Sequence, residues 1–218
     1  MTLKPLHRRG LGRLSIMYNL PYFKASNEQQ VIDFMKAHPF VMLIAKGDEY
    51  PVATQVPVLF AEKDGRLVLR AHIMRKTDHQ LALEKDTNVL VIFSGAHNYI
   101  SASWYTNQQQ GSTWNYRSVH AQGKLRFTGP DELLQLLTDL TDTFENNPDS
   151  PSLVKHLPED YMTSLMKAIV GIEIEITDIQ HVFKISQNRD KESFENIVSE
   201  LEKGNADAKV MAETMKKL

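Results

Sequence analysis

The 218-residue sequence contains no cysteine. This absence excludes disulfide bonds, thiolate metal sites, iron–sulfur clusters and cysteine nucleophiles. The sequence also has no apolar run approaching the roughly 20 residues that a helix needs to cross a bilayer, so we expect no membrane partner. A chain without cysteine fits the reducing cytoplasm, and we predict that location.

Several motifs that define enzyme classes are missing as well. No segment matches the glycine-rich signatures of dinucleotide or nucleotide-triphosphate binding, and no G-x-S-x-G elbow is present. None of the eight histidines forms an H-x-H or H-E-x-x-H pair, so we predict no metal site. Rossmann enzymes, P-loop proteins, serine hydrolases and zinc proteases are therefore poor matches.

Positive charge is scarce outside the first sixteen residues. That basic leader carries Lys4, Arg8, Arg9 and Arg13 and no acid, whereas the rest holds 21 basic against 27 acidic residues. An acidic body argues against a broad nucleic-acid-binding surface, so direct DNA binding is left uncertain. We expect residues 1–16 to be disordered or extraneous and residues 17–218 to form a single domain with C-terminal helices.

The hydrophobic pattern predicts an antiparallel sheet with flanking helices. Ser26 to Gln29 resembles a capping box that opens a helix ending at Ala37. The run 40–45 predicts a buried strand, and 52–60 predicts a second strand whose Pro57 indicates an edge or a bulge. Glu62 to Gly65 is a hairpin signal before a strand over 66–72. Further strands are expected at 89–93, 114–127, 169–176 and 181–186, and further helices at 78–84, from 131, at 159–168, around 194–204 and at 206–218.

This count gives six or seven strands without regular β-α-β alternation. A doubly wound parallel sheet is therefore disfavoured, and the fold class we predict is mainly β or α+β, an antiparallel barrel with flanking helices.

Polar and aromatic residues gather where the expected strands end. The neighbouring cations Arg75 and Lys76 suit a phosphate group, and the rings of Trp104 and Trp114 suit a flat ligand. Taken singly, each tryptophan is more typical of a core, and Arg75 of a solvated surface. Together they favour a phosphate-bearing aromatic cofactor.

The same stretches resemble the PaiB family of FMN-binding negative transcriptional regulators. The segments that carry the resemblance, which covers about nine tenths of the chain, are H38-P-F40, A53-T54 with Pro57, H72-I-M-R75, G95-A-H-N-Y-I-S101, S103-W-Y105, T113-W-N-Y116, V119-H120, A168-I-V-G171 and F183-K-I-S-Q-N-R189. The resemblance implies a split β-barrel, like those of pyridoxamine-phosphate oxidases and flavin reductases, that forms a homodimer with FMN at the subunit interface.

Carried over to this chain, the resemblance implies a set of FMN-binding residues. Arg75 and Lys76 become candidates for the phosphate, and Gln55 stands where relatives often have histidine. The full set of cofactor-binding candidates is Thr54, Gln55, His72, Arg75, Lys76, His97, Trp114, Lys184 and Gln187.

Three functions stay open on the sequence. The family label implies an FMN-binding transcriptional regulator. The fold also permits a flavin-dependent oxidoreductase acting on a small molecule, in which FMN carries the chemistry. The third is a non-catalytic flavin or haem carrier, for which His72, His97 or His120 could serve as an axial ligand.

Overall fold

The structure is a computed structural model that describes residues 20–218. The predicted basic leader, residues 1–16, lies outside the described residues. The described chain divides into two compact units. We call residues 39–92 and 121–179 the barrel unit, and residues 20–38, 93–120 and 180–218 the helix unit. The expectation of a single domain over 17–218 stays a prediction.

A seven-stranded sheet is the main element of the fold. Its strands are β1 (Phe40–Ala45), β2 (Val52–Pro57), β3 (Leu59–Lys63), β4 (Arg66–Met74), β5 (Asn88–Ile100), β6 (Thr113–Phe127) and β7 (Ile169–Lys184). Their order across the sheet is β2-β1-β5-β6-β7-β4-β3. Strands β1 to β4 belong to the barrel unit, whereas β5, β6 and β7 contribute residues to both units.

Pro57 divides what the sequence predicted as one strand. The expectation of a strand over 52–60 is wrong, because β2 ends at Pro57 and β3 starts at Leu59. Proline has no N–H for a sheet ladder, and the next amide, that of Val58, donates instead to the Pro39 carbonyl at 2.8 Å. Pro57 does lie on an edge strand, as the sequence indicated.

This break explains how the sheet closes. Strands β2 and β3 are consecutive in the chain but form the two opposite edges of the sheet. A single residue links them, so the sheet curls until its edges approach, and β2 also contacts β4. The result is a split β-barrel, and the predicted fold class is confirmed.

The hairpin between β3 and β4 follows the local sequence. Asp64 and Gly65 both have positive φ, 53° and 75°. Two central residues with positive φ define the type I′ turn that matches the twist of a two-residue hairpin, for which Asp-Gly is a preferred pair. The hairpin signal at Glu62 to Gly65 is confirmed.

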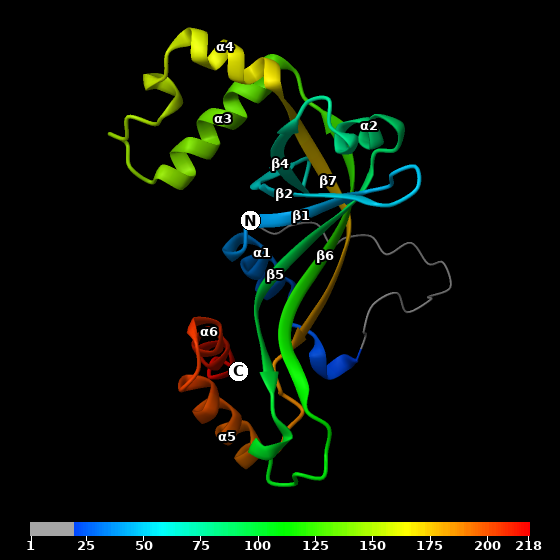
Figure 1. Ribbon diagram of the computed structural model, residues 1–218, viewed down its shortest axis with the longest axis vertical. Helices are drawn as coiled ribbons and strands as arrows, with labels where there is room; N and C mark the ends of the chain where they lie inside the picture. Colours follow the sequence, from blue (N-terminus) through cyan, green and yellow to red (C-terminus); the bar gives the residue numbers. More distant parts are fainter. Residues whose placement is uncertain (1–19) are drawn as a thin grey trace. The chain divides into compact units, whose positions relative to one another are not determined.

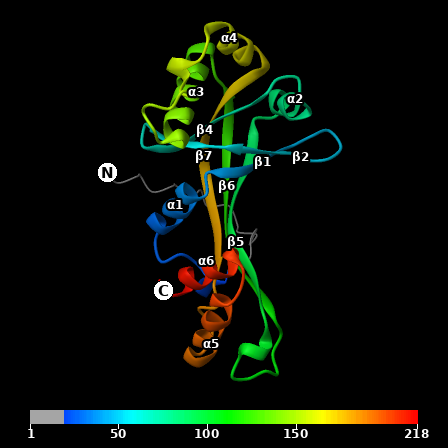
Figure 2. The same ribbon diagram turned by 60° about the vertical axis from the view of Figure 1, so that its left-hand side comes forward.

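Three helices complete the barrel unit: α2 (Asp78–Lys85), α3 (Pro130–Glu145) and α4 (Glu159–Ala168). A short 3-10 turn, Val154–His156, lies between α3 and α4, which run side by side in both views (Figures 1 and 2). Their apolar faces meet in a cluster of Leu133, Leu136, Leu137, Leu140, Met162 and Ile169. Helices were expected at all three places.

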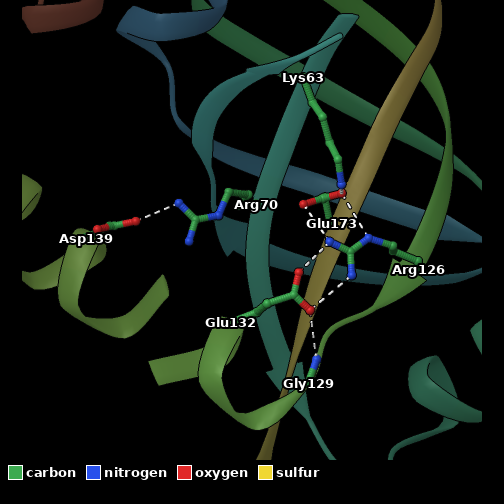
Figure 3. Close-up of polar contacts among 7 residues, drawn as sticks. All are labelled: Lys63, Arg70, Arg126, Gly129, Glu132, Asp139 and Glu173. Carbon is green, nitrogen blue, oxygen red and sulfur yellow. Dashed lines mark hydrogen bonds and ion pairs between the residues drawn. The ribbon is translucent and has the colours of Figure 1, made fainter. Parts of the chain in front are cut away.

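Ion pairs attach α3 to the outer face of the barrel sheet (Figure 3). Arg126 on β6 lies between two carboxylates, 2.6 Å from Glu132 on α3 and 2.8 Å from Glu173 on β7. Arg70 on β4 pairs with Asp139 on α3 at 2.6 Å. The hydrogen bonds from Arg126 and from the Gly129 amide lower the pKa of Glu132 to about 2. The start and the middle of α3 are therefore both held to the sheet.

The helix unit contains α1 (Glu28–Ala37), α5 (Lys191–Glu202) and α6 (Ala206–Met215), with 3-10 turns at Pro21–Phe23 and Ala102–Trp104. Helix α1 is capped one residue later than the sequence suggested, because Asn27 accepts from the Gln30 amide at 2.9 Å. Helices α5 and α6 pack side by side (Figure 2). Their shared core with the neighbouring strands comprises Ile100, Tyr105, Ile185, Ile197, Leu201, Ala208, Met211, Ala212 and Met215.

Two strands are longer than the apolar segments from which they were predicted. Strand β5 continues from the expected end at 93 to Ile100, and the separate strands expected at 169–176 and 181–186 form the single strand β7. The polar residues that interrupt each pattern are accommodated because their side chains can stay at the surface while the backbone ladder continues. Within the described residues, no helix is long and apolar enough to cross a membrane.

Candidate functional site

The turn from β4 into α2 presents the two cations that the sequence singled out. The turn is tightly built: the Arg75 amide donates to the Ala168 carbonyl at 2.9 Å, and Lys76 has a φ of 61°. The Lys76 amide donates to the Gln80 side chain at 2.6 Å, and Thr77 caps α2 by accepting from the Gln80 amide. The backbone that carries Arg75 and Lys76 is therefore fixed at the N-terminus of α2.

Arg75 and Lys76 are free to bind an anion. Both side chains are exposed, and neither takes part in a hydrogen bond or ion pair with another described residue. A helix N-terminus also favours negative charge through its dipole. The Asp78 carboxylate competes only in part, because it accepts from the His79 amide at 2.8 Å. The turn thus fits a phosphate group.

Thr54 and Gln55 lie on β2, on opposite faces of the sheet. Thr54 is opposite Leu43, which is fully buried, so its side chain is on the core face. Gln55 is opposite Met42 and is exposed. On that same outer face Phe40 is 61% and Met42 is 40% exposed, so Gln55 belongs to an apolar surface of the barrel unit.

His72 is partly buried two residues before the end of β4. Burial lowers its pKa, which keeps the imidazole neutral at neutral pH. Its Nδ1 has no hydrogen-bond partner among the described residues. His79 on α2 is buried too, and neither of its ring nitrogens has such a partner. Burial lowers the pKa of His79, and the nearby Asp78 carboxylate partly offsets this.

In the helix unit, Trp114 stands on a surface with two other rings. It is 52% exposed, and its ring centroid lies 6.0 Å from that of His97 and 5.9 Å from that of Tyr99. Trp104, by contrast, packs against the core around α5 and α6. Of the two tryptophans, Trp114 is therefore the one available to a flat ligand.

A cavity of about 390 Å³ adjoins His97. Its lining residues are Ser94, Gly95, His97, Tyr116, Arg117, Ser118, His120 and Val182. Along β6, Trp114, Tyr116, Ser118 and His120 are alternate residues and share one face of the strand. Burial lowers the pKa of His120, so its imidazole is neutral at neutral pH. The cavity offers hydroxyl and imidazole groups beside an aromatic surface.

Ser94, Tyr116 and Ser118 were not predicted as cofactor-binding residues from the sequence, and His120 was named there only as a candidate haem ligand. The signal was available in β6, where every second residue from Trp114 to His120 is aromatic, hydroxyl-bearing or imidazole-bearing. Core positions of a strand are apolar, so this pattern marks a polar face.

Lys184 and Gln187 are engaged elsewhere in the helix unit. The Lys184 ammonium donates to the Thr113 hydroxyl, and Thr113 precedes Trp114, so it faces the other side of β6. Gln187 closes the turn after β7: its side chain accepts from the Ile185 amide at 2.8 Å and donates to the Phe183 carbonyl at 2.5 Å. The structure brings His97 together with Trp114, and Arg75 with Lys76, but joins neither Lys184 nor Gln187 to these groups. The roles predicted for all nine residues stay predictions.

Comparison with known proteins identifies the family. Residues 17–178 match the family model described as "Putative FMN-binding domain". The chain belongs to this FMN-binding family. Protease synthase and sporulation protein PAI 2 of Bacillus subtilis is 35% identical over 200 residues, which cover 91% of this chain and 96% of the relative. The resemblance to the PaiB family is thereby confirmed, and family membership assigns FMN as the cofactor.

Two solved structures with low sequence identity share the fold. The FAD and heme binding protein from Mycobacterium smegmatis superposes with a TM-score of 0.55 at 16% identity, covering 73% of this chain and 72% of that chain. The flavocytochrome Anf3 from Azotobacter vinelandii gives a TM-score of 0.52 at 14% identity, covering 73% and 68%. At such identities these structures support the split-barrel fold of this FMN-binding family member.

Proposed function

We propose that this protein binds FMN with the phosphate at Arg75 and Lys76. The observation that carries the proposal is the fixed turn before α2, which holds at a helix N-terminus two exposed cations that have no side-chain partner among residues 20–218. Arginine and lysine side chains at the positive end of a helix dipole are typical of a phosphate site. The remaining barrel-unit candidates, Thr54, Gln55 and His72, lie on strands of the same unit.

The aromatic surface of Trp114, Tyr99 and His97 is proposed as a separate contact for a flat ring system. The half-exposed Trp114 ring can stack against a flat aromatic ligand, and the isoalloxazine ring of FMN is such a ligand. When bound, FMN supplies electron and hydride transfer, whereas the protein orients the ring and controls access of water. Inside the cavity beside His97, the neutral imidazole of His120 and the hydroxyls of Ser94 and Ser118 are available for hydrogen bonds to a ligand.

A homodimer is part of the proposal. Phe40 and Met42 leave a large part of their side chains in water on the outer face of β1. Exposed apolar sheet faces of this kind mark protein interfaces, and burying one against a second copy removes it from water. The cytoplasmic location predicted from the cysteine-free sequence stays a prediction.

Regulation of transcription, the role implied by the PaiB resemblance, is the biological function that we propose for the FMN-bound protein. The name of PAI 2 points to sporulation and protease synthesis in its own organism. A flavin-dependent oxidoreductase is the second candidate, favoured by the cavity beside His97, which has the size of a small-molecule site.

Flavin fluorescence tests the phosphate site. FMN is titrated into FMN-free protein, into Arg75→Ala and into Arg66→Ala, a control that removes an exposed arginine from the other end of β4. We expect saturable quenching in the wild type and the control, and about 10- to 100-fold weaker binding in Arg75→Ala, since a charge-assisted hydrogen bond contributes about 1.5–3 kcal/mol. Equal affinity in all three proteins would refute the assignment.

A further inference from the structure

His79 is the second residue of α2 and lies on the face of that helix that packs against the barrel sheet. Its side chain is only 4% exposed. Ala82 and Leu83, three and four residues further along, are buried on the same face. The helix contacts β1 and β2. His79 is therefore part of the packing between a helix and two strands.

The strands that α2 contacts supply no charge to balance a proton on His79. Strands β1 (Phe40–Ala45) and β2 (Val52–Pro57) contain no ionisable side chain. In the described part of the chain, neither ring nitrogen of His79 has a hydrogen-bond partner. A buried cation without a counter-charge or hydrogen bond is far more costly than a buried neutral ring. This position therefore favours the neutral imidazole.

The charged residues around His79 lie on α2 and in the segments next to it. Burial lowers the His79 pKa, and the carboxylate of the preceding residue, Asp78, partly offsets this. Asp78 is exposed, so water and salt screen its charge. Glu84 is exposed more than one helical turn further on, and Lys85 pairs with Asp48 of the β1–β2 loop at 2.6 Å. Asp78 is thus the charged group that acts on the imidazole.

The same end of α2 holds the turn that carries Arg75 and Lys76. Gln80, the residue after His79, accepts from the Lys76 amide at 2.6 Å. The Gln80 amide donates to the Thr77 hydroxyl at 3.3 Å. Movement of His79 out of its buried place would displace Gln80 and break these hydrogen bonds. The conformation of the turn therefore depends on the packing of His79, and its two exposed cations add no counter-charge for a proton there.

We propose that His79 makes this turn a pH-sensitive switch: protonation of the imidazole releases the first turn of α2 from the sheet and weakens the anion site at Arg75 and Lys76. In the packed state His79 is buried and neutral. In the released state it is in water and can carry the proton. The release itself does not depend on the proposed function, whereas its effect on FMN binding rests on it.

The sign of the pH dependence follows from the two states. The released imidazole titrates near the ordinary histidine pKa of about 6.5, and burial lowers the pKa of the packed one. The released state therefore binds the proton first as the pH falls. The packed state is fully favoured above about pH 6.5. Below it, each pH unit raises the ratio of released to packed protein about tenfold, until the pH reaches the packed-state pKa.

Hydrogen exchange of the FMN-free protein over α2 tests the switch, at pH 7.5 and pH 5.5, one unit either side of about 6.5. After correction for the intrinsic pH dependence of exchange, we expect wild-type protection to fall several-fold at the lower pH, and at most about tenfold. His79→Met is apolar and does not titrate, so its protection should be equal at both. His156→Met, at an exposed position of the same unit, is the matched control and should behave like the wild type. His72 is present in all three proteins.

Wild-type protection of α2 that does not change between the two pH values, or an equal loss in His79→Met, would overturn the proposal. If the methionine variant does not fold, NMR titration of the wild type still decides, because a His79 pKa at or above about 6.5 in the folded protein would contradict the packed neutral state.

FMN titration at the two pH values separates the switch from the proposed function. Protonation of the FMN phosphate weakens binding in every protein alike. We expect the wild type and His156→Met to lose several-fold more affinity on acidification than His79→Met. Equal losses in all three would contradict the link between His79 and the anion site. Absence of FMN binding in every protein would refute the proposed function, and the exchange result would still decide the release of α2.

Discussion

A buried pair of polar residues holds the end of β7. The Asn115 side chain is fully buried and donates to Ser186 Oγ at 2.9 Å, and the Ser186 hydroxyl donates back at 3.1 Å. Ser186 has a φ of 62°, in the left-handed region that non-glycine residues rarely adopt. The reciprocal hydrogen bonds offset that strain and set the turn that follows.

Replacement of Asn115 by alanine should therefore destabilise the protein. The Ser186 hydroxyl loses both bonds in a buried place, which costs about 1–3 kcal/mol of unfolding free energy. Urea unfolding of Asn115→Ala beside the loop variant Asn107→Ala measures the difference. A midpoint for Asn115→Ala equal to that of the loop variant would show that the pair does not hold the turn.

His181 makes the helix unit sensitive to acid. Burial and the nearby Lys24 lower its pKa to about 4, and its Nε2 accepts from the Ala25 amide at 3.0 Å. A histidine whose folded pKa is below its unfolded value, about 6.5, is protonated first in the unfolded chain. Its contribution to stability is complete above pH 6.5 and is lost as the pH falls toward 4.

The pH dependence is tested by His181→Gln, which can keep an acceptor for Ala25 without titrating. We expect the wild type to lose more unfolding free energy than the variant between pH 6.5 and pH 4. Parallel curves for the two proteins over this interval would show that His181 does not titrate as described.

At the scale of elements, the β3–β4 turn depends on glycine. Gly65 has a φ of 75°, where an L-residue costs about 1–2 kcal/mol. We expect Gly65→Ala to lower the unfolding free energy by that amount. Gly111→Ala is the control, because a Cβ there meets nothing within 4 Å. Equal stability of the two variants would argue against the type I′ turn.

Elements were predictable from sequence where local chemistry decides them. The Asp64-Gly65 turn and the run 40–45 carry their own signals, and β1 has the expected bounds. Pro57 was recognised as unusual, but its consequence was not, because the separation of β2 and β3 to opposite edges depends on pairing with distant strands. The unbroken strand β7 is likewise decided by long-range pairing, although Thr177, Asp178 and Gln180 interrupt the apolar pattern.

At the scale of the whole molecule, the candidate site was predictable only in parts. Arg75 and Lys76 are adjacent in sequence, so their closeness at one turn could be predicted without knowing the fold. To predict the cavity beside His97, one would have to know which β6 residues lie on the same face of the sheet as the β5 residues that line it. The engagement of Lys184 with Thr113 depends on a contact across 71 residues and has no sequence signal.

The apolar outer face of β1 leads to a prediction about assembly. Met42→Lys places a charge on a surface proposed to be buried between two copies, so it should shift the protein toward monomer. Leu81→Lys, on an exposed position of α2, should leave the mass unchanged. Light scattering at micromolar concentration measures both, and a monomeric wild type would contradict the proposed dimer.

The central claim is that the turn before α2 binds the phosphate of FMN. Calorimetric titration of the FMN-free protein with FMN and with riboflavin, which lacks the phosphate, tests it most directly, in the wild type and in the Arg75→Ala/Lys76→Ala double variant. The account predicts that the wild type binds FMN at least tenfold more tightly than riboflavin, and that the double variant binds the two flavins equally. A preference for FMN that persists undiminished in the double variant would contradict the claim.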